Sequence, residues 1–173
     1  MSHYQRTTRE CTLDQLQPEL AHALRQYFQQ HQLSNVEAEI LMCCETSSTR
    51  TSTNQLDAWL NRDLATDTTL ALLLTPERLI WALNSERSGV VVASARLLEL
   101  RVKVFAPRGS GDFGLDLYGH MADTKVRTGG KLVMGPEEAA KRFCEAIGDA
   151  MQKLYPPEKK RNWPKWLGGY RDP

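Results

Sequence analysis

The 173-residue sequence has little net charge and no long apolar segment, and both absences limit the classes of protein to which it can belong. Its 22 lysine and arginine residues nearly balance 21 aspartate and glutamate residues, for a formal net charge of +1. A balanced chain gives no general reason to expect nucleic acid as a partner. The polar amino terminus lacks the apolar core of a secretory signal, and stretches such as LALLL are far shorter than the roughly 20 residues that span a bilayer. The sequence therefore predicts a soluble cytoplasmic protein.

Cysteine is scarce, and its four copies have no metal-binding spacing. No C-x-x-C pair is present, and no histidine lies at zinc-ligand spacing from a cysteine. Cys43 and Cys44 are neighbours, but adjacent side chains on a strand point to opposite faces, so these two are poorly placed to share one ion. We expect reduced, buried structural thiols, and we expect no metal or other cofactor.

One short segment, GSGDFG at residues 109–114, matches two nucleotide-site signatures at once. A dinucleotide-binding glycine loop leads from a strand into a helix whose amino terminus holds the pyrophosphate. The segment FGLDLYGHM alternates as a strand does, and the lysine and catalytic-loop motifs of protein kinases are absent from the sequence. We therefore interpret GSGDFG as a hairpin loop between strands, in which glycine permits positive φ.

Two segments have helical periodicity. Apolar side chains recur at spacings of three and four from Pro18 to about His31, and again from Pro136 to Tyr155. The apolar faces consist of Leu20, Leu24, Tyr27, Phe28 and His31 in the first segment, and of Ala140, Phe143, Cys144, Ile147, Ala150, Met151 and Leu154 in the second. A third, short helix capped by Asn54 is expected within NQLDAWLNRDL.

Between the two long helices, apolar runs and alternation predict about seven strands. They fall roughly at residues 37–47 and in TTLALLLT, RLIWALN, GVVVASARL, LELRVKVFA, FGLDLYGHM and TKVRTGGKLVMG. In LELRVKVFA, one face is expected to carry Leu98, Leu100, Val102 and Val104, and the other Glu99, Arg101 and Lys103. The short turns require antiparallel neighbours, because a parallel crossover needs about a dozen residues or more.

The predicted architecture is therefore α+β and mainly β. It is a curled antiparallel sheet of about seven strands that forms a barrel or two packed sheets, capped by a carboxy-terminal amphipathic helix and preceded by an extra amino-terminal helix. We divide the chain into an amino-terminal helical extension at residues 1–35, a domain at 36–155, and a basic, aromatic tail at 156–173.

The segment LALLLTPERLIWAL, from Leu70 to Leu83, resembles the strand, L-T-x-x-R-L, strand hairpin of bacterial pleckstrin-homology-like domains. The later strands and the closing helix are similar in order and length to that fold, so the resemblance covers roughly residues 36–155. It implies a non-enzymatic binding or scaffold module with no catalytic residues, and the fold alone does not name the ligand. Lipid-binding members carry clustered basic residues between the first two strands, where this chain has an inserted segment and only Arg50 and Arg62. The resemblance therefore does not favour an inositol phosphate.

The candidate contact residues lie mainly in the tail, where five basic residues outnumber two acidic ones and aromatic residues are interleaved. They are Lys159, Lys160, Arg161, Trp163, Trp166 and Tyr170, together with Arg101 and Lys103 on the strand face. Such a tail can pack on its own domain or on a neighbouring copy, or contact lipid headgroups. The leading hypothesis is binding of a protein segment or self-association into a homo-oligomer, by strand addition at an exposed edge or by docking of the tail.

Two alternatives remain at this point. One is peripheral, weak contact with anionic lipid through the tail and the Arg101 and Lys103 face. The other, more remote, is a small hydrolase or transferase in which His120 acts with Asp116 or Asp123. No nucleic-acid partner is expected.

Overall fold

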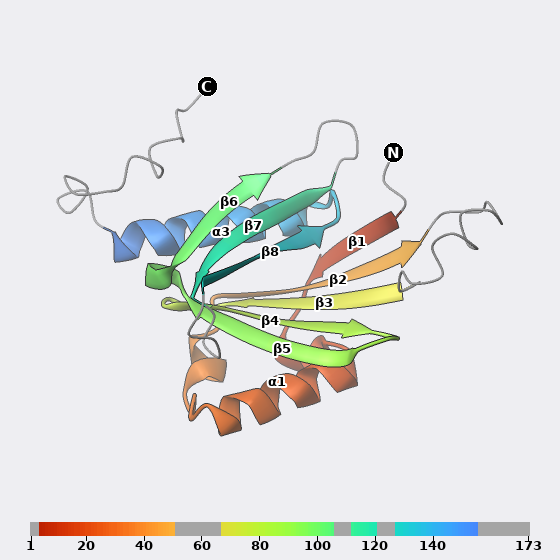
Figure 1. Ribbon diagram of the computed structural model, residues 1–173, viewed down its shortest axis with the longest axis horizontal. Helices are drawn as coiled ribbons and strands as arrows, with labels where there is room; N and C mark the ends of the chain where they lie inside the picture. The colour runs from red at the N-terminus through yellow and green to blue at the C-terminus, as the bar shows by residue number, and fades with distance from the viewer. Residues whose placement is uncertain (1–3, 51–66, 106–111, 121–126, 156–173) are drawn as a thin grey trace.

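The computed structural model describes residues 4–50, 67–105, 112–120 and 127–155. The predicted helix capped by Asn54 and the tail at 156–173 lie outside this part of the chain. The described elements, shown in Figure 1, are β1 (Tyr4–Glu10), η1 (Leu13–Gln15), α1 (Pro18–Gln30), η2 (Val36–Glu39), β2 (Met42–Arg50), β3 (Asp67–Leu74), β4 (Arg78–Ser85), β5 (Gly89–Arg96), η3 (Leu97–Glu99), β6 (Leu100–Phe105), β7 (Phe113–His120), β8 (Arg127–Met134) and α3 (Glu138–Leu154), where η marks a short 3-10 helix.

The strands form two antiparallel sheets, so the prediction of a mainly β, α+β fold is confirmed. One sheet has the order β1-β2-β3-β4-β5 and the other the order β6-β7-β8. Of the two expected forms, a closed barrel is not found among the described residues, whereas two packed sheets are, because both sheets contribute to one core. The short helix η3 turns the chain between β5 and β6, and each of these strands pairs with only one described neighbour.

The central strand of the first sheet, β3, is buried on both faces from Leu70 onward. Leu70, Leu72 and Leu74 belong to a core shared with the second sheet and α3, whereas Ala71 and Leu73 belong to a core beneath α1. Figure 1 shows the same arrangement, with α1 on one side of this sheet and the second sheet on the other. The unbroken apolar run LALLL is thus a strand that contributes to both cores.

Both long helices lie close to where their periodicity places them. Helix α1 begins at Pro18, and its buried residues are Leu20, Ala21, Leu24, Tyr27 and Phe28. Helix α3 begins at Glu138, just after Pro136, and its buried residues are Ala140, Phe143, Cys144, Ile147 and Ala150. The hydroxyl groups of Tyr27 and Ser94 lie 2.9 Å apart, which joins α1 to β5.

Three local features differ from the sequence-based expectation. Strand β1 was not expected, because YQRTTRE has no apolar alternation; it pairs with β2 along its whole length. The strand expected at 37–47 begins only at Met42, after the short helix η2. Leu98 does not belong to the inward face of the next strand but is 54% exposed, since it lies in η3, and Leu97 is buried in its place.

Candidate functional site

The outer strands of the sheets differ in how their free edges are covered. On β1, the backbone N–H of Thr8 donates to Oε2 of Glu137 at 2.8 Å, and Oγ1 of Thr8 accepts from the N–H of Gly135 at 2.8 Å. Arg6 forms an ion pair of 2.5 Å with the buried Asp112. The residues before α3 and at the start of β7 therefore close this edge of the first sheet.

Gly135 has to be small for this closure. A Cβ atom at this position would lie 2.3 Å from Oε2 of Glu137 and 2.8 Å from the carbonyl oxygen of Arg6. Both atoms belong to the contacts that hold β1 against the segment before α3, so a larger residue would displace them.

The outer face of the second sheet carries charges of both signs. The sequence-predicted contact residues Arg101 and Lys103 are exposed on β6. Lys103 lies opposite Asp116 on β7, which in turn lies opposite Lys131 on β8 at an ion-pair distance of 3.7 Å. Asp116 thus separates the two lysines and lowers the net positive charge of this face.

The described residues of the segment GSGDFG, from Asp112 to Gly114, lead into β7 of this sheet. Asp112 pairs with Arg6, Phe113 packs against the core, and Gly114 lies beneath the ring of Phe105. A Cβ atom on Gly114 would lie 2.3 Å from that ring, which explains the last glycine of the motif. The prediction that the motif connects strands is confirmed, because it leads from β6 into the antiparallel β7; residues 109–111 lie outside the described part.

Strand β5 is an outer strand of a different kind. Its sequence GVVVASAR has three consecutive valines, no proline and no charge before Arg96. The side chain of Val91 is 52% exposed and lies opposite Leu83, which is 38% exposed. Val90 and Val92 point to the other face, where they pack partly against the core beneath α1. The strand therefore presents an apolar, uncharged edge of the kind that natural sheets usually protect.

The pattern of hydrogen bonds between β4 and β5 shows which backbone groups of β5 point outward. The N–H of Leu97 donates to the carbonyl of Glu77 at 2.8 Å, and the backbone of Arg78 is turned toward Thr75. Because hydrogen-bonded and non-hydrogen-bonded pairs alternate in an antiparallel ladder, the N–H and C=O groups of Val90, Val92 and Ser94 point away from β4. Ser94 is fully buried, so the accessible outward groups are those of Val90 and Val92. No backbone bond from another described segment reaches them.

No protein-family model, curated protein or solved structure matches this chain.

An open, acidic hollow of about 520 Å³ lies at the end of β5 where the strand begins. Its lining includes Glu19 of α1, Asp67 of β3 and Glu86 of the turn before β5, together with Val90. The side chain of Asn84 donates to Glu19 at 2.8 Å and fixes one of these carboxylates. A segment lying along β5 would thus meet apolar side chains first and an acidic surface at its end.

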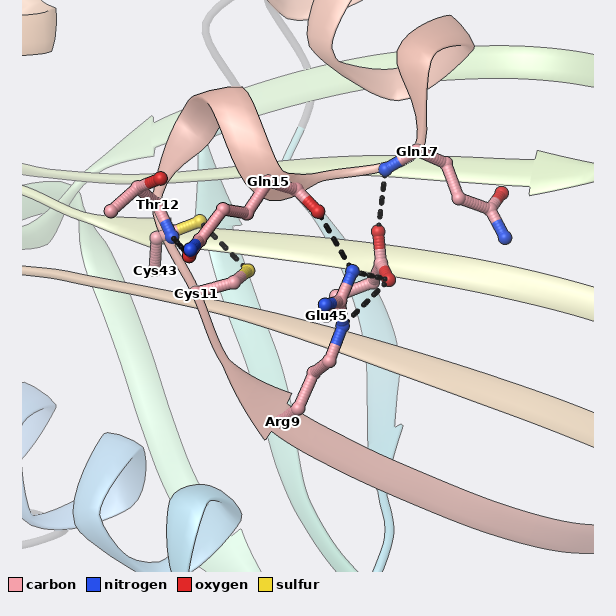
Figure 2. A network of polar contacts seen from close by, with 7 residues as sticks. All are labelled: Arg9, Cys11, Thr12, Gln15, Gln17, Cys43 and Glu45. Atoms are coloured by element: carbon pink, nitrogen blue, oxygen red, sulfur yellow. Dashed lines mark hydrogen bonds and ion pairs between the residues drawn. The ribbon is translucent and has the colours of Figure 1, made fainter.

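A second polar cluster lies at the other end of the closed edge (Figure 2). The carboxylate of Glu45 is 5% exposed, accepts from Nη2 of Arg9 at 2.8 Å, and accepts from the backbone N–H of Gln17 at 2.7 Å. Gln17 immediately precedes α1, so Glu45 ties the start of this helix to β2. The hydrogen bond and charge of Glu45 raise the pKa of Arg9.

Two cysteines lie beside this cluster. The sulfur atoms of Cys11 and Cys43 are 3.8 Å apart.

The other sequence-predicted residues are placed as follows. The tail residues Lys159, Lys160, Arg161, Trp163, Trp166 and Tyr170 lie outside the described part, as does Asp123. Asp116 and His120 share a face of β7 but are four residues apart, or roughly 13 Å along a strand. Asp116 instead contacts Lys131.

The described ranges contain neither a metal-binding cluster nor a membrane-spanning helix. In these ranges, no group of three or more histidine, cysteine, aspartate or glutamate residues could hold a metal ion. No described helix has both the length and the apolar character needed to cross a bilayer.

Sequence reasoning did not identify the β5 edge. The residues concerned are Leu83, Val91 and Arg96. The signal that could have found them is the run of three valines with no proline or lysine, but which strand lies at an edge depends on pairing between distant segments.

Proposed function

We propose that this protein is a non-enzymatic binding or scaffold module of the pleckstrin-homology-like kind, which binds an extended protein segment along the outer edge of β5. The observation that supports the proposal most is the pair of outward backbone positions at Val90 and Val92, next to the exposed side chains of Val91 and Leu83. Added strands gain backbone hydrogen bonds from such an edge and specificity from alternate side chains.

The occupant that fits best is β5 of a second copy. In an antiparallel pair related by a two-fold axis at Val91, Val90 of one copy lies opposite Val92 of the other. These outward residues both face the α1 side of the sheet, where the acidic hollow also lies. Arg96 is exposed, with a distant contact of 3.9 Å to Glu99, so its guanidinium can reach the hollow of the second copy.

The test compares lysine substitutions at two exposed apolar positions. A charge on an edge strand opposes strand addition, so we expect Val91→Lys to weaken self-association at least about tenfold, or about 1.4 kcal/mol. The matched control is Leu41→Lys, because Leu41 is 56% exposed and lies near the far end of the first sheet. Sedimentation equilibrium over a wide range of concentrations measures the association.

A second arm covers partners other than self. A display library of extended peptides is panned against the wild-type protein and both lysine variants. The proposal predicts enrichment of apolar peptides with a basic end on the wild type and Leu41→Lys, and loss of that enrichment on Val91→Lys. A wild-type protein that stays monomeric and enriches no peptide above Val91→Lys contradicts the proposed function.

A further inference from the structure

Cys11 and Cys43 form a cross-strand pair. Glu10 lies opposite Cys44 in the register of β1 and β2, and the next pair is Cys11 and Cys43, joined by an N–H to carbonyl hydrogen bond of 3.0 Å. Their sulfur atoms are 3.8 Å apart (Figure 2). Directly opposed residues in an antiparallel ladder have Cα atoms about 4.5–5.5 Å apart, which lies within the separation that a disulfide spans.

The two thiols differ in their access to solvent. Cys11 is partly exposed, whereas Cys43 is only 3% exposed and belongs to the core beneath α1. The remaining cysteines, Cys44 and Cys144, are buried in the core on the opposite face of the sheet. An oxidant in solution therefore reaches Cys11 first, and the only thiol in contact with it among the described residues is Cys43.

The charges around the pair favour ionisation of Cys11. The hydrogen bond between the two sulfur atoms lowers the pKa of Cys11, because Cys43 can donate to an ionised Cys11, and the charge of Arg9 lowers it further. Partial burial and the carboxylates of Glu45 and Glu10 oppose this effect without reversing it. The same hydrogen bond, together with burial, raises the pKa of Cys43, which therefore keeps its proton.

We propose that Cys11 and Cys43 are a reversible thiol–disulfide site whose oxidant is a hydroperoxide. The sulfur of Cys11 attacks the terminal oxygen of the hydroperoxide, an S–O bond forms and the O–O bond breaks. The leaving oxygen takes up the proton that Cys11 has lost and departs as an alcohol or water. The sulfur of Cys43 then attacks the sulfenic acid of Cys11, an S–S bond forms, and the S–O bond breaks. The proton of Cys43 leaves with the hydroxyl group as water, so two thiols lose two electrons in all.

The experiment treats the reduced full chain with hydrogen peroxide, then denatures it and alkylates the remaining thiols. We expect two of the four cysteines to escape alkylation, the intact mass to fall by two hydrogen atoms, and peptide mapping to join Cys11 to Cys43. Dithiothreitol restores four alkylated cysteines. Four free thiols after oxidation, or a bridge that includes Cys44 or Cys144, overturn the proposal. This measurement uses the wild-type protein and does not depend on the folding of any variant.

Two variants separate the roles of the two sulfurs. Cys43→Ser leaves Cys11 as a sulfenic acid that dimedone traps, whereas Cys11→Ser leaves Cys43 unmodified. The matched control is Cys144→Ala, in which the bridge still forms. In the native wild type, iodoacetamide alkylates Cys11 on the order of tenfold faster than any other cysteine, with a pH midpoint below the ordinary thiol value. Equal rates for Cys11 and Cys43 contradict the assigned roles.

Discussion

The two outer strands of the five-stranded sheet differ in almost every property that decides whether an edge can pair. Strand β1 is polar, and Glu137, Gly135 and Asp112 occupy its outer side through hydrogen bonds and an ion pair. Strand β5 is apolar along most of its length, and its outward backbone groups receive no bond from another described backbone segment. This fold therefore closes one edge of the sheet with side-chain and backbone groups from the second half of the chain, and leaves the other edge without such contacts among the described residues.

The largest expected effect comes from breaking the closed edge at Thr8. Its hydroxyl is buried, lies 2.8 Å from that of Thr46, and accepts from the N–H of Gly135. Thr8→Val keeps the shape of the side chain but removes the partner of the Thr46 hydroxyl and of the Gly135 N–H. We therefore expect it to lower the free energy of unfolding by about 2–3 kcal/mol. Urea denaturation measures the change.

The matched control for Thr8→Val is the reverse substitution on the open edge. Val91→Thr places a hydroxyl in solvent, because this side chain is about half exposed. We expect a change of stability within about 0.5 kcal/mol. Equal losses for the two variants would show that the edges do not differ in the way described.

An intermediate effect is expected at Glu137. Its carboxylate accepts the N–H of Thr8, and Glu137→Ala removes this charge-assisted bond from a partly buried position. We expect a loss of about 1–2 kcal/mol. Glu138→Ala is the control, because Glu138 is exposed and its nearest cation, Lys141, is 3.8 Å away; its loss stays below about 0.5 kcal/mol. Thermal unfolding of both variants tests the contrast, and a larger loss at Glu138 contradicts it.

The smallest effect is a weakening of the closed edge at alkaline pH. Cys44 lies opposite Glu10, and burial raises the pKa of Cys44 to about 12. As the pH rises above the ordinary thiol value, the unfolded chain loses this proton while the folded chain keeps it. Stability therefore falls with rising pH, by at most about 1.4 kcal/mol per pH unit for one group.

The variant Cys44→Ala isolates this dependence. Other groups that titrate between pH 9 and 10 are common to both proteins, so the difference between their slopes belongs to Cys44. We expect urea midpoints of the wild type to fall faster than those of Cys44→Ala over this range. Parallel slopes would show that Cys44 is not protected in the folded state.

The parts of the fold that the sequence predicts are those determined by neighbouring residues. The periodicity of α1 and α3 and the tight turn between β3 and β4 are local, and the structure contains all of them. The opposite directions of Cys43 and Cys44 also follow from strand geometry, and they enter different cores.

The parts that could not be predicted depend on distant partners. Strand β1 has one buried residue, Thr8, and its hydrogen-bond partners come from β2 and from residues near α3. The sequence pattern also missed η3, in which Leu97 is buried and Leu98 is exposed, although Leu98 was expected to face inward. The edge position of β5, and hence the candidate site, follows from the same turn. Local patterns contain none of this information.

The alternation of β3 has a consequence for how the molecule unfolds. Its odd- and even-numbered side chains belong to different hydrophobic cores, so displacement of this strand would disrupt both cores. Helix α1 on one side and helix α3 on the other are thereby mechanically coupled through a single extended segment, although they lie on opposite faces of the sheet. Because one strand contributes to both cores, we expect the two cores to unfold together.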